Sequence, residues 1–392
     1  MMRHTLLLWV SCCCLLWLAA CGESATESRL SSPTPAPPTP VPTVLSAVMP
    51  TAVMTTTVVP TATTPILHQV DTMLNQLVEA NQFSGSVLIA QAGKVLVSKG
   101  YGLADQAKNL PNTPQTKFRL GSLTKQFTAL AVLMLQAQGA LDVQDPICNY
   151  LPDCPPAWQA ITIHHLLTHT AGLPNFTDFP DYEASKQLPT TPEQTISRFQ
   201  DNPLDFAPGE GWNYSNSGYI VLGSIIEQAA GQPYADFLQT RIFTPLGMTS
   251  TGYEDDASQL AIGYADGATV ADMIDMSIPF AAGGLYATVE DLYLWDQALA
   301  TEKLLPQALL DAMFTPWAAI PESNGLHYGY GWLVGEQFGH QVVGHNGGIE
   351  GFATSFMRFP NEQVVIIALS NLQATNPDAL SKQLAQIVFE GK

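Results

Sequence analysis

The sequence predicts an α+β fold in which strands from both ends of the globular chain form one sheet, with a mostly helical lobe beside it. Two observations favour this arrangement. Segments rich in strand-forming residues occur near the start of the globular part, at 86–98, and again near its end, at 341–369. The region between about 141 and 281 has helical apolar spacing and long loops instead. Strands far apart in the chain, with helices between them, indicate one sheet with a helical insertion.

The first globular elements are a helix and a hairpin. Residues 66–80 repeat apolar side chains at helical spacing, which predicts a helix. Residues 86–90 and 95–98 are rich in strand formers, and Ala92-Gly93-Lys94 is suited to the turn between them. A long apolar helix is then expected to begin at Ser122 and to reach about residue 138, where a glycine closes it.

The later elements are predicted by the same patterns. The clearest helices of the middle region are expected at 163–167 and 218–230. Three strands and a final helix are expected near the end of the chain, at 341–343, 353–359, 364–369 and 379–389.

Composition and charge narrow the classes of function. The chain has 392 residues, of which 46% are hydrophobic, so the folded part can form a large core. Its formal net charge is −19, with only 15 lysines and arginines. An acidic surface repels phosphate backbones, so we expect no nucleic-acid partner, and we interpret the charge as a means of solubility.

The first 20 residues are predicted to be a signal peptide. Arg3 supplies a short positive region, and residues 6–18 are almost wholly apolar but too short for a comfortable membrane span. Small residues then precede Cys21. This ending resembles the bacterial lipobox, which implies cleavage before Cys21 and diacylglycerol on its thiol. The alternative is an ordinary signal with an incidental cysteine, because cysteines also occur at 12–14.

Residues 21–65 are predicted to be the lipidated cysteine and a Pro/Thr-rich linker, and residues 66–392 the globular domain. Such a proline-rich segment forms neither helix nor sheet and serves as a semi-rigid spacer. We therefore expect an exported lipoprotein, on the cell surface or in the periplasm, anchored to a bacterial membrane through Cys21. Disulfides persist in exported proteins, which favours a bridge between Cys148 and Cys154; two free thiols are the alternative.

The first candidate catalytic motif is Ser122-Leu123-Thr124-Lys125, the only Ser-x-x-Lys in the chain. Residues three apart share a helix face, so the hydroxyl and the amine would meet. A serine needs a base to become a nucleophile, and a lysine is such a base only where its surroundings favour the neutral amine. The start of a helix also directs backbone N–H groups toward a developing oxyanion.

The second motif is Tyr214-Ser215-Asn216, the only Tyr-x-Asn although the chain has twelve tyrosines. A phenol beside Lys125 could relay the proton from Ser122 to the leaving group. The Asn216 amide can donate a hydrogen bond to a substrate carbonyl and accept one from an amide. The alternative interpretation is a loop of turn-forming residues.

The third motif is His345-Asn346-Gly347-Gly348, which follows the expected strand at 341–343. Its glycines are expected to let a substrate backbone approach closely. The N–H groups of Ser122 and Gly348 are the expected oxyanion hole. The segment His327-Tyr328-Gly329 has the same skeleton, but it lacks the preceding strand and the second glycine.

Together the motifs resemble the penicillin-binding protein and serine β-lactamase superfamily, nearest its class C-like branch. The resemblance covers nearly all of residues 66–390 and extends beyond the motifs to the surrounding segments, at 118–129, 161–174, 208–216 and 282–288. It implies a β-lactamase/transpeptidase-like fold, with an antiparallel sheet flanked by helices and a mostly helical lobe.

The resemblance also implies the chemistry. Ser122 would form an acyl-enzyme, Lys125 and Tyr214 would be the acid–base pair, and Asn216 and Asn346 would touch the substrate. The expected reaction is hydrolysis of an amide or ester in a small D-alanyl peptide, ester or β-lactam, without a cofactor. We expect a monomer.

One motif departs from the β-lactamase pattern. Those members usually carry Lys-Thr-Gly, whereas this chain has His345-Asn346-Gly347. The His-x-Gly form resembles D-alanyl-D-alanine peptidases, D-amino-acid peptidases and esterases of the same family. A histidine is mostly neutral at pH 7, which argues against efficient β-lactam hydrolysis. We expect His345 either to gain charge near pH 6.5 and favour carboxylate-bearing substrates, or only to hold the strand end by a hydrogen bond.

The sequence also allows a rival function and a rival kind of site. A non-turnover sensor lipoprotein that binds penicillin is the alternative function, but a pure binder needs no proton relay. A metal site at His164, His165 and His169 is disfavoured, because no helix face brings all three together with a carboxylate. The substrate pocket is expected to involve the loops at about 175–207 and 252–280.

Overall fold

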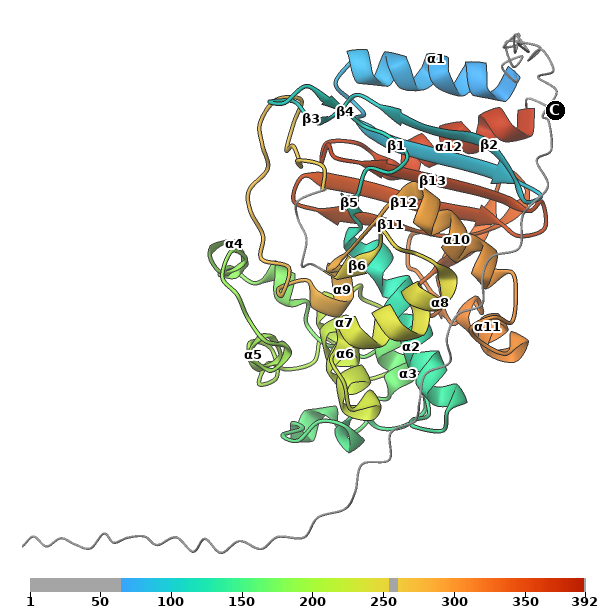
Figure 1. The fold of residues 1–392 in the computed structure, drawn as a ribbon. Helices are drawn as coiled ribbons and strands as arrows, with labels where there is room; N and C mark the ends of the chain where they lie inside the picture. The colour runs from blue at the N-terminus through green and yellow to red at the C-terminus, as the bar shows by residue number, and fades with distance from the viewer. Residues whose placement is uncertain (1–64, 254–259, 391–392) are drawn as a thin grey trace, which may run out of the picture. The chain divides into compact units, whose positions relative to one another are not determined.

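Figure 1 shows the computed structural model, which describes residues 65–253 and 260–390. The predicted signal peptide, Cys21 and the linker up to residue 64 lie outside these ranges. Within the described ranges, no helix is both long enough and apolar enough to cross a membrane.

An eight-stranded sheet forms the centre of the fold, and all of its neighbouring strands pair in antiparallel fashion. Figure 1 shows that it joins blue strands from the start of the globular chain to red strands from its end, as predicted. In spatial order the strands are β2 (Lys94–Tyr101), β1 (Gly85–Gln91), β13 (Val364–Ser370), β12 (Phe352–Phe359), β11 (His340–Ile349), β10 (Leu333–Gln337), β9 (His327–Tyr328) and β8 (Ala318–Ala319).

The central strands are buried on both faces, so alternate side chains enter two different cores. Val87 and Ile89 of β1 pack with the helices α1 (Pro65–Glu79) and α12 (Pro377–Glu390). Leu88 and Ala90 point the other way, into the larger core that includes α10 (Val289–Leu299) and the helical lobe. Helices cover both faces, which explains why these strands are continuous apolar runs.

The helical lobe is built around α2 (Thr124–Ala137) and α6 (Asn216–Ala230), which pack against each other. Its other helices are α3 (Ile163–Leu167), α4 (Tyr182–Ser185), α5 (Pro192–Ser197), α7 (Tyr234–Leu238), α8 (Thr244–Leu246), α9 (Phe280–Gly283) and α11 (Gln307–Met313). Short helical turns are η1 (Gly121–Leu123), η2 (Ile147–Asn149), η3 (Pro156–Trp158), η4 (Phe176–Asp178) and η5 (Gln239–Phe243). Two small sheets pair β3 (Leu103–Asp105) with β4 (Leu110–Pro111), and β5 (Phe118–Arg119) with β7 (Leu285–Ala287) and β6 (Gly252–Tyr253).

The predicted α+β fold is confirmed, and two boundaries near the motifs differ from expectation. Ser122 lies in the tight turn η1, and the regular helix begins only at Thr124. Gly121 adopts a φ of +53°, outside the range of a right-handed helix, so the helix cannot extend back through it.

The second difference is the length of β11. The sequence predicted a strand ending at residue 343 with the histidine motif after it, but β11 continues to Ile349. Gly347 pairs with Thr354 and Gly348 pairs with Ala353. Pairing with β12 therefore overrides the weak strand preference of two successive glycines.

Cys148 and Cys154 are joined by a disulfide in the structure, with their Cα atoms 5.2 Å apart. Both pack at the edge of the larger core: Cys148 belongs to η2, and Cys154 lies between η2 and η3. The bridge closes a loop of only a few residues, so it constrains the unfolded chain modestly, by about 2 kcal/mol.

Candidate active site

The turn η1, which carries Ser122, packs directly against strand β11. A Cβ atom on Gly347 would lie 2.0 Å from the carbonyl oxygen of Leu120, so only glycine fits there. A Cβ atom on Gly121 would lie 2.9 Å from the amide nitrogen of Gly348. Gly347 therefore makes room for the chain's own backbone, a packing role that the sequence did not predict. The same contact places the Gly348 amide beside the residue that precedes Ser122.

Lys125 lies at the start of α2 and is completely buried. Its Nζ is 3.1 Å from Ser122 Oγ, 2.9 Å from Asn216 Oδ1 and 2.8 Å from the carbonyl oxygen of Ala282. No carboxylate is among these partners, and burial lowers the pKa of Lys125 well below its usual value. Burial thus supplies the condition under which a lysine becomes a base.

The partners of Lys125 also fit its neutral form. A neutral amine has two N–H donors and one lone pair, whereas the ammonium has three donors and none. Asn216 Oδ1 and the Ala282 carbonyl can only accept, so they take the two donors. The remaining partner, Ser122 Oγ, carries a proton that it can donate. The lone pair is then directed at the hydroxyl that must be deprotonated.

Tyr214 precedes α6 and faces both members of this pair. Its ring centroid is 4.9 Å from Lys125 Nζ. Burial raises the pKa of Tyr214, and a hydrogen bond with Ser122 partly opposes that rise. Tyr214 is therefore a neutral phenol at physiological pH, able to pass a proton on rather than to hold a negative charge.

Asn216, the first residue of α6, connects Lys125 to the loop that carries Thr177. Its side-chain oxygen accepts from Lys125, and its side-chain nitrogen donates to Thr177 Oγ1 over 3.3 Å. Its backbone N–H donates to Asn175 Oδ1. The sequence predicted contact with substrate, and the residue does line the cleft. Its positioning of Lys125 was not predicted.

His345 is buried in β11, with both ring nitrogens hydrogen-bonded. Its Nδ1 is 2.6 Å from the carbonyl oxygen of Asn346, which can only accept, so Nδ1 carries the proton. Its Nε2 then accepts from the Tyr328 hydroxyl over 2.9 Å. Burial, with the nearby charge of Lys125, lowers the pKa of His345 to about 3. The structure therefore argues against a gain of charge near pH 6.5 and favours the hydrogen-bonded alternative.

These groups meet in a cleft of about 680 Å³. Ser122, Tyr214 and Asn216 line it, as do His345, Asn346, Gly347 and Gly348. Both expected loops contribute walls, through Phe176, Thr177, Tyr182, Ile274 and Pro279. The other histidine with a similar skeleton, His327, belongs to β9 and is not part of the lining.

His169 was not predicted to take part in the site, and the structure places it directly behind Tyr214. The two ring centroids are 4.3 Å apart. His169 Nδ1 accepts from the Ser215 amide, and burial lowers the pKa of His169 well below its usual value. The two residues are far apart in the chain, so no local pattern could have shown the contact.

The neighbouring histidines have structural roles. His165 caps α3 through its contact with Thr162, and His164 Nδ1 is 2.8 Å from the Tyr330 hydroxyl. Among the described residues, no group of three or more metal-binding side chains is positioned to hold an ion.

Comparison with known proteins shows the family to which this chain belongs. Residues 70–388 match the family model described as Beta-lactamase. The chain is 30% identical over 345 residues to penicillin-binding protein 4* of Bacillus subtilis (strain 168), covering 82% of this chain and 75% of that protein. It is also 30% identical over 316 residues to esterase EstB of Burkholderia gladioli, covering 68% of this chain and 78% of the esterase.

Solved structures agree with the sequence comparisons. The octameric penicillin-binding protein homologue from Pyrococcus abyssi has a TM-score of 0.75 at 27% identity, covering 83% of this chain and 77% of that one. The D-amino acid amidase from Ochrobactrum anthropi SV3 has a TM-score of 0.74 at 26% identity, covering 83% of this chain and 99% of the amidase. The chain therefore belongs to the β-lactamase family of serine hydrolases, whose members similar to it include penicillin-binding proteins, an esterase and a D-amino acid amidase.

Proposed function

We propose that this protein hydrolyses an ester or amide through an acyl-enzyme on Ser122. The observation that carries the proposal is the contact of 3.1 Å between Ser122 Oγ and the Nζ of Lys125, whose other two partners are obligate acceptors. A buried amine without a carboxylate partner has a lowered pKa and can take the serine proton near neutral pH.

The proposed reaction has two halves. Ser122 Oγ attacks the substrate carbonyl carbon as its proton passes to Lys125, and the carbon–oxygen or carbon–nitrogen bond to the leaving group breaks. The leaving alcohol or amine receives the proton by way of Tyr214, which has the protonated phenol that this step requires. Water then attacks the acyl-enzyme, gives its proton to the same pair, and releases the acid with Ser122 restored.

The N–H groups of Ser122 and Gly348 are the proposed oxyanion hole. The close approach of Gly121 to the Gly348 amide supports this assignment, because it brings β11 beside the turn that carries Ser122. Two fixed backbone donors aimed at the developing negative charge commonly contribute a factor of about 10² or more to the rate.

Turnover is proposed in preference to the alternative of a penicillin-binding sensor. A sensor requires acylation alone. Here Lys125 contacts both Ser122 and Tyr214, so the groups that would return a proton to Ser122 and to the leaving group lie together. The esterase and the amidase among the similar proteins favour the same conclusion.

A side-by-side assay tests this proposal. Residues 61–392 should be incubated with a fluorophosphonate probe and assayed on a short-chain ester, a D-alanyl-D-alanine peptide and a cephalosporin. We expect labelling of Ser122 and steady turnover of the ester, and Ser122→Ala should abolish both. Labelling at another serine would refute the assignment, and a burst of acylation without turnover would support the sensor.

We also propose that the protein is exported and held at a bacterial membrane by a lipid on Cys21. Support comes from the sequence alone, because residues 1–64 lie outside the described ranges. Growth with labelled palmitate should tag the full-length protein. Cys21→Ser should remove the tag and release the protein from membranes; a variant that stays bound would show that the uncleaved signal is the anchor.

A further inference from the structure

Among the described residues that line the cleft, Glu350 is the only aspartate, glutamate, lysine or arginine. It lies two residues after Gly348, in the turn directly after β11. The rest of the lining is apolar, aromatic or neutral, and His345 is held neutral by its two hydrogen bonds. A substrate bound at Ser122 therefore meets one formal charge in the wall of the cleft, and that charge is negative.

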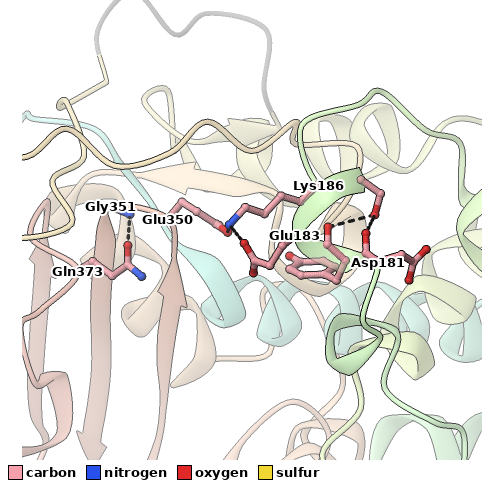
Figure 2. Close-up of polar contacts among 8 residues, drawn as sticks. Asp181, Glu183, Lys186, Glu350, Gly351 and Gln373 are labelled. Atoms are coloured by element: carbon pink, nitrogen blue, oxygen red, sulfur yellow. Dashed lines mark hydrogen bonds and ion pairs between the residues drawn. The ribbon is translucent and has the colours of Figure 1, made fainter.

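The position of Glu350 is fixed by the turn that follows it. Gly351 has a φ of +81°, and a Cβ atom there would lie 2.5 Å from Gly263 Cα, so the turn packs tightly against another segment. The Gly351 N–H donates to Gln373 Oε1 over 2.9 Å, as Figure 2 shows. The Glu350 side chain is 16% exposed. This carboxylate is thus built into the wall rather than free to move into solvent.

Lys186 forms an ion pair with Glu350, and Figure 2 shows the Lys186 amine between the carboxylates of Glu350 and Glu183. Its Nζ is 3.0 Å from Glu350 Oε1 and 2.6 Å from Glu183 Oε2. Its side chain is 8% exposed, and its backbone is fixed by hydrogen bonds to Tyr182 and Asp275. An amine held by two carboxylates is not available to a third carboxylate from a substrate.

Glu350 lines the cleft, whereas Lys186 and Glu183 do not, so the carboxylate is the charge of this group that a bound substrate meets first. A substrate carboxylate near Glu350 would meet like charge without a free cation, whereas an ammonium group would be attracted. We propose that Glu350 is a specificity-determining residue that disfavours substrates bearing a carboxylate beside the scissile bond and favours those bearing an ammonium group. This inference rests on the proposed hydrolysis at Ser122 and names its substrate class.

Matched esters test the inference. One series has the charge on the acyl side: 4-nitrophenyl esters of hexanoic acid, 6-aminohexanoic acid and adipic acid. The other has it on the leaving side: butyrates of 3-methylphenol, 3-hydroxyphenyltrimethylammonium and 3-hydroxybenzoate. The measured quantity is kcat/KM for each charged ester divided by that for its neutral partner, so that a general loss of activity cancels.

Two variants should shift these ratios in opposite directions. Glu350→Gln should raise the carboxylate ratio and lower the ammonium ratio by about five- to tenfold in at least one series, as expected for charges several ångströms apart in partly screened surroundings. Lys186→Met removes the cation, so it should lower the carboxylate ratio and raise the ammonium ratio. Glu183→Gln is the matched control, because Glu183 contacts the same lysine but is 74% exposed and is not part of the lining, so its ratios should change less than twofold.

The outcomes are distinguishable. If the esters are hydrolysed by labelled Ser122 but Glu350→Gln leaves all ratios within twofold, the inference is wrong and the proposed function stands. Equal shifts in Glu183→Gln and Glu350→Gln would also overturn it, because net charge alone would then explain the preference. If no ester is hydrolysed and Ser122 is not labelled, the proposed function fails and the inference fails with it.

Discussion

Two lysines with little solvent exposure contact residues that line the same cleft, yet their surroundings are opposite. Lys125 contacts a hydroxyl, an amide oxygen and a backbone carbonyl, and burial lowers its pKa well below the usual value. Lys186 contacts two carboxylates, which raise its pKa despite the cost of burial. Burial without a carboxylate partner therefore lowers the pKa of Lys125, whereas two carboxylate partners outweigh burial at Lys186.

Exchanging each lysine for methionine should produce the largest difference between them. Lys125→Met keeps an apolar chain of similar length and removes the base, so kcat/KM for a neutral ester should fall by about 10² or more. Lys186→Met should change the same quantity less than tenfold, because Lys186 does not contact Ser122. Circular dichroism should confirm that both variants are folded. Equal losses of activity would contradict the division of roles.

A carboxylate placed beside Lys125 should turn its surroundings into those of Lys186. Asn216→Asp puts an acid where an amide oxygen now lies 2.9 Å from Nζ. An opposite charge at that distance favours the ammonium and raises the pKa of Lys125 by about 1–3 units. Less of the neutral amine is then present at pH 7, so kcat/KM should fall and recover as the pH rises.

The control for this variant is Asn216→Ala, which removes the same hydrogen bond without adding charge. Its kcat/KM should also fall, but the acid side of its pH profile should stay near that of the wild type. The profile from pH 5.5 to 10 separates the two effects. An unchanged acid side in Asn216→Asp would show that the protonation of Lys125 does not limit the reaction.

The two lysines also differ in what the sequence could predict of them. Ser122 and Lys125 are three residues apart, so helical geometry alone brings them together, even though Ser122 lies in the turn before the helix. Lys186, which follows α4, and Glu350, which follows β11, come from distant segments and meet only in the folded structure. A single sequence contains no pattern that pairs them.

The same distinction between local patterns and contacts of distant segments explains which other sequence-based predictions were correct and which were not. The strands β1, β12 and β13 were predicted because a sheet covered on both faces needs continuous apolar runs, such as β13, whereas the short strands β8, β9 and β10 were not predicted. The end of β11 was misplaced because its glycines are held by pairing with β12, which is a tertiary effect. The sequence left two roles open for His345, because its burial and its contact with Tyr328 cannot be seen locally.

A smaller effect is expected on stability, and it concerns Lys186. Removing this lysine leaves Glu350 partly buried without its cation, which should cost about 1–3 kcal/mol and lower Tm by a few degrees. The contact with Glu183 should add little, because that side chain is 74% exposed. The double variant Lys186→Met/Glu350→Gln removes the stranded charge and should recover part of the loss. A double variant no more stable than Lys186→Met would show that apolar packing, not charge, fixes this contact.

The smallest expected effect is none at all, and it tests whether protonation of His345 adds a cation to the cleft. His345 occupies the position where β-lactamase members usually carry lysine, so its protonation would supply a charge for a substrate carboxylate. The structure opposes this: Nδ1 already donates to a carbonyl, Nε2 accepts from Tyr328, and burial lowers the pKa of His345 to about 3. His345 should then stay neutral from pH 5.5 to 8.

The ratio of kcat/KM for the adipate monoester to that for the hexanoate ester should change less than twofold over this range, since protonation of Lys125 slows both reactions and cancels. The measurement belongs in Glu350→Gln as well as in the wild type, so that the one carboxylate of the described lining does not contribute. A ratio that rises severalfold below pH 6.5 in both proteins would show that His345 gains a proton and that its hydrogen bonds do not hold it neutral.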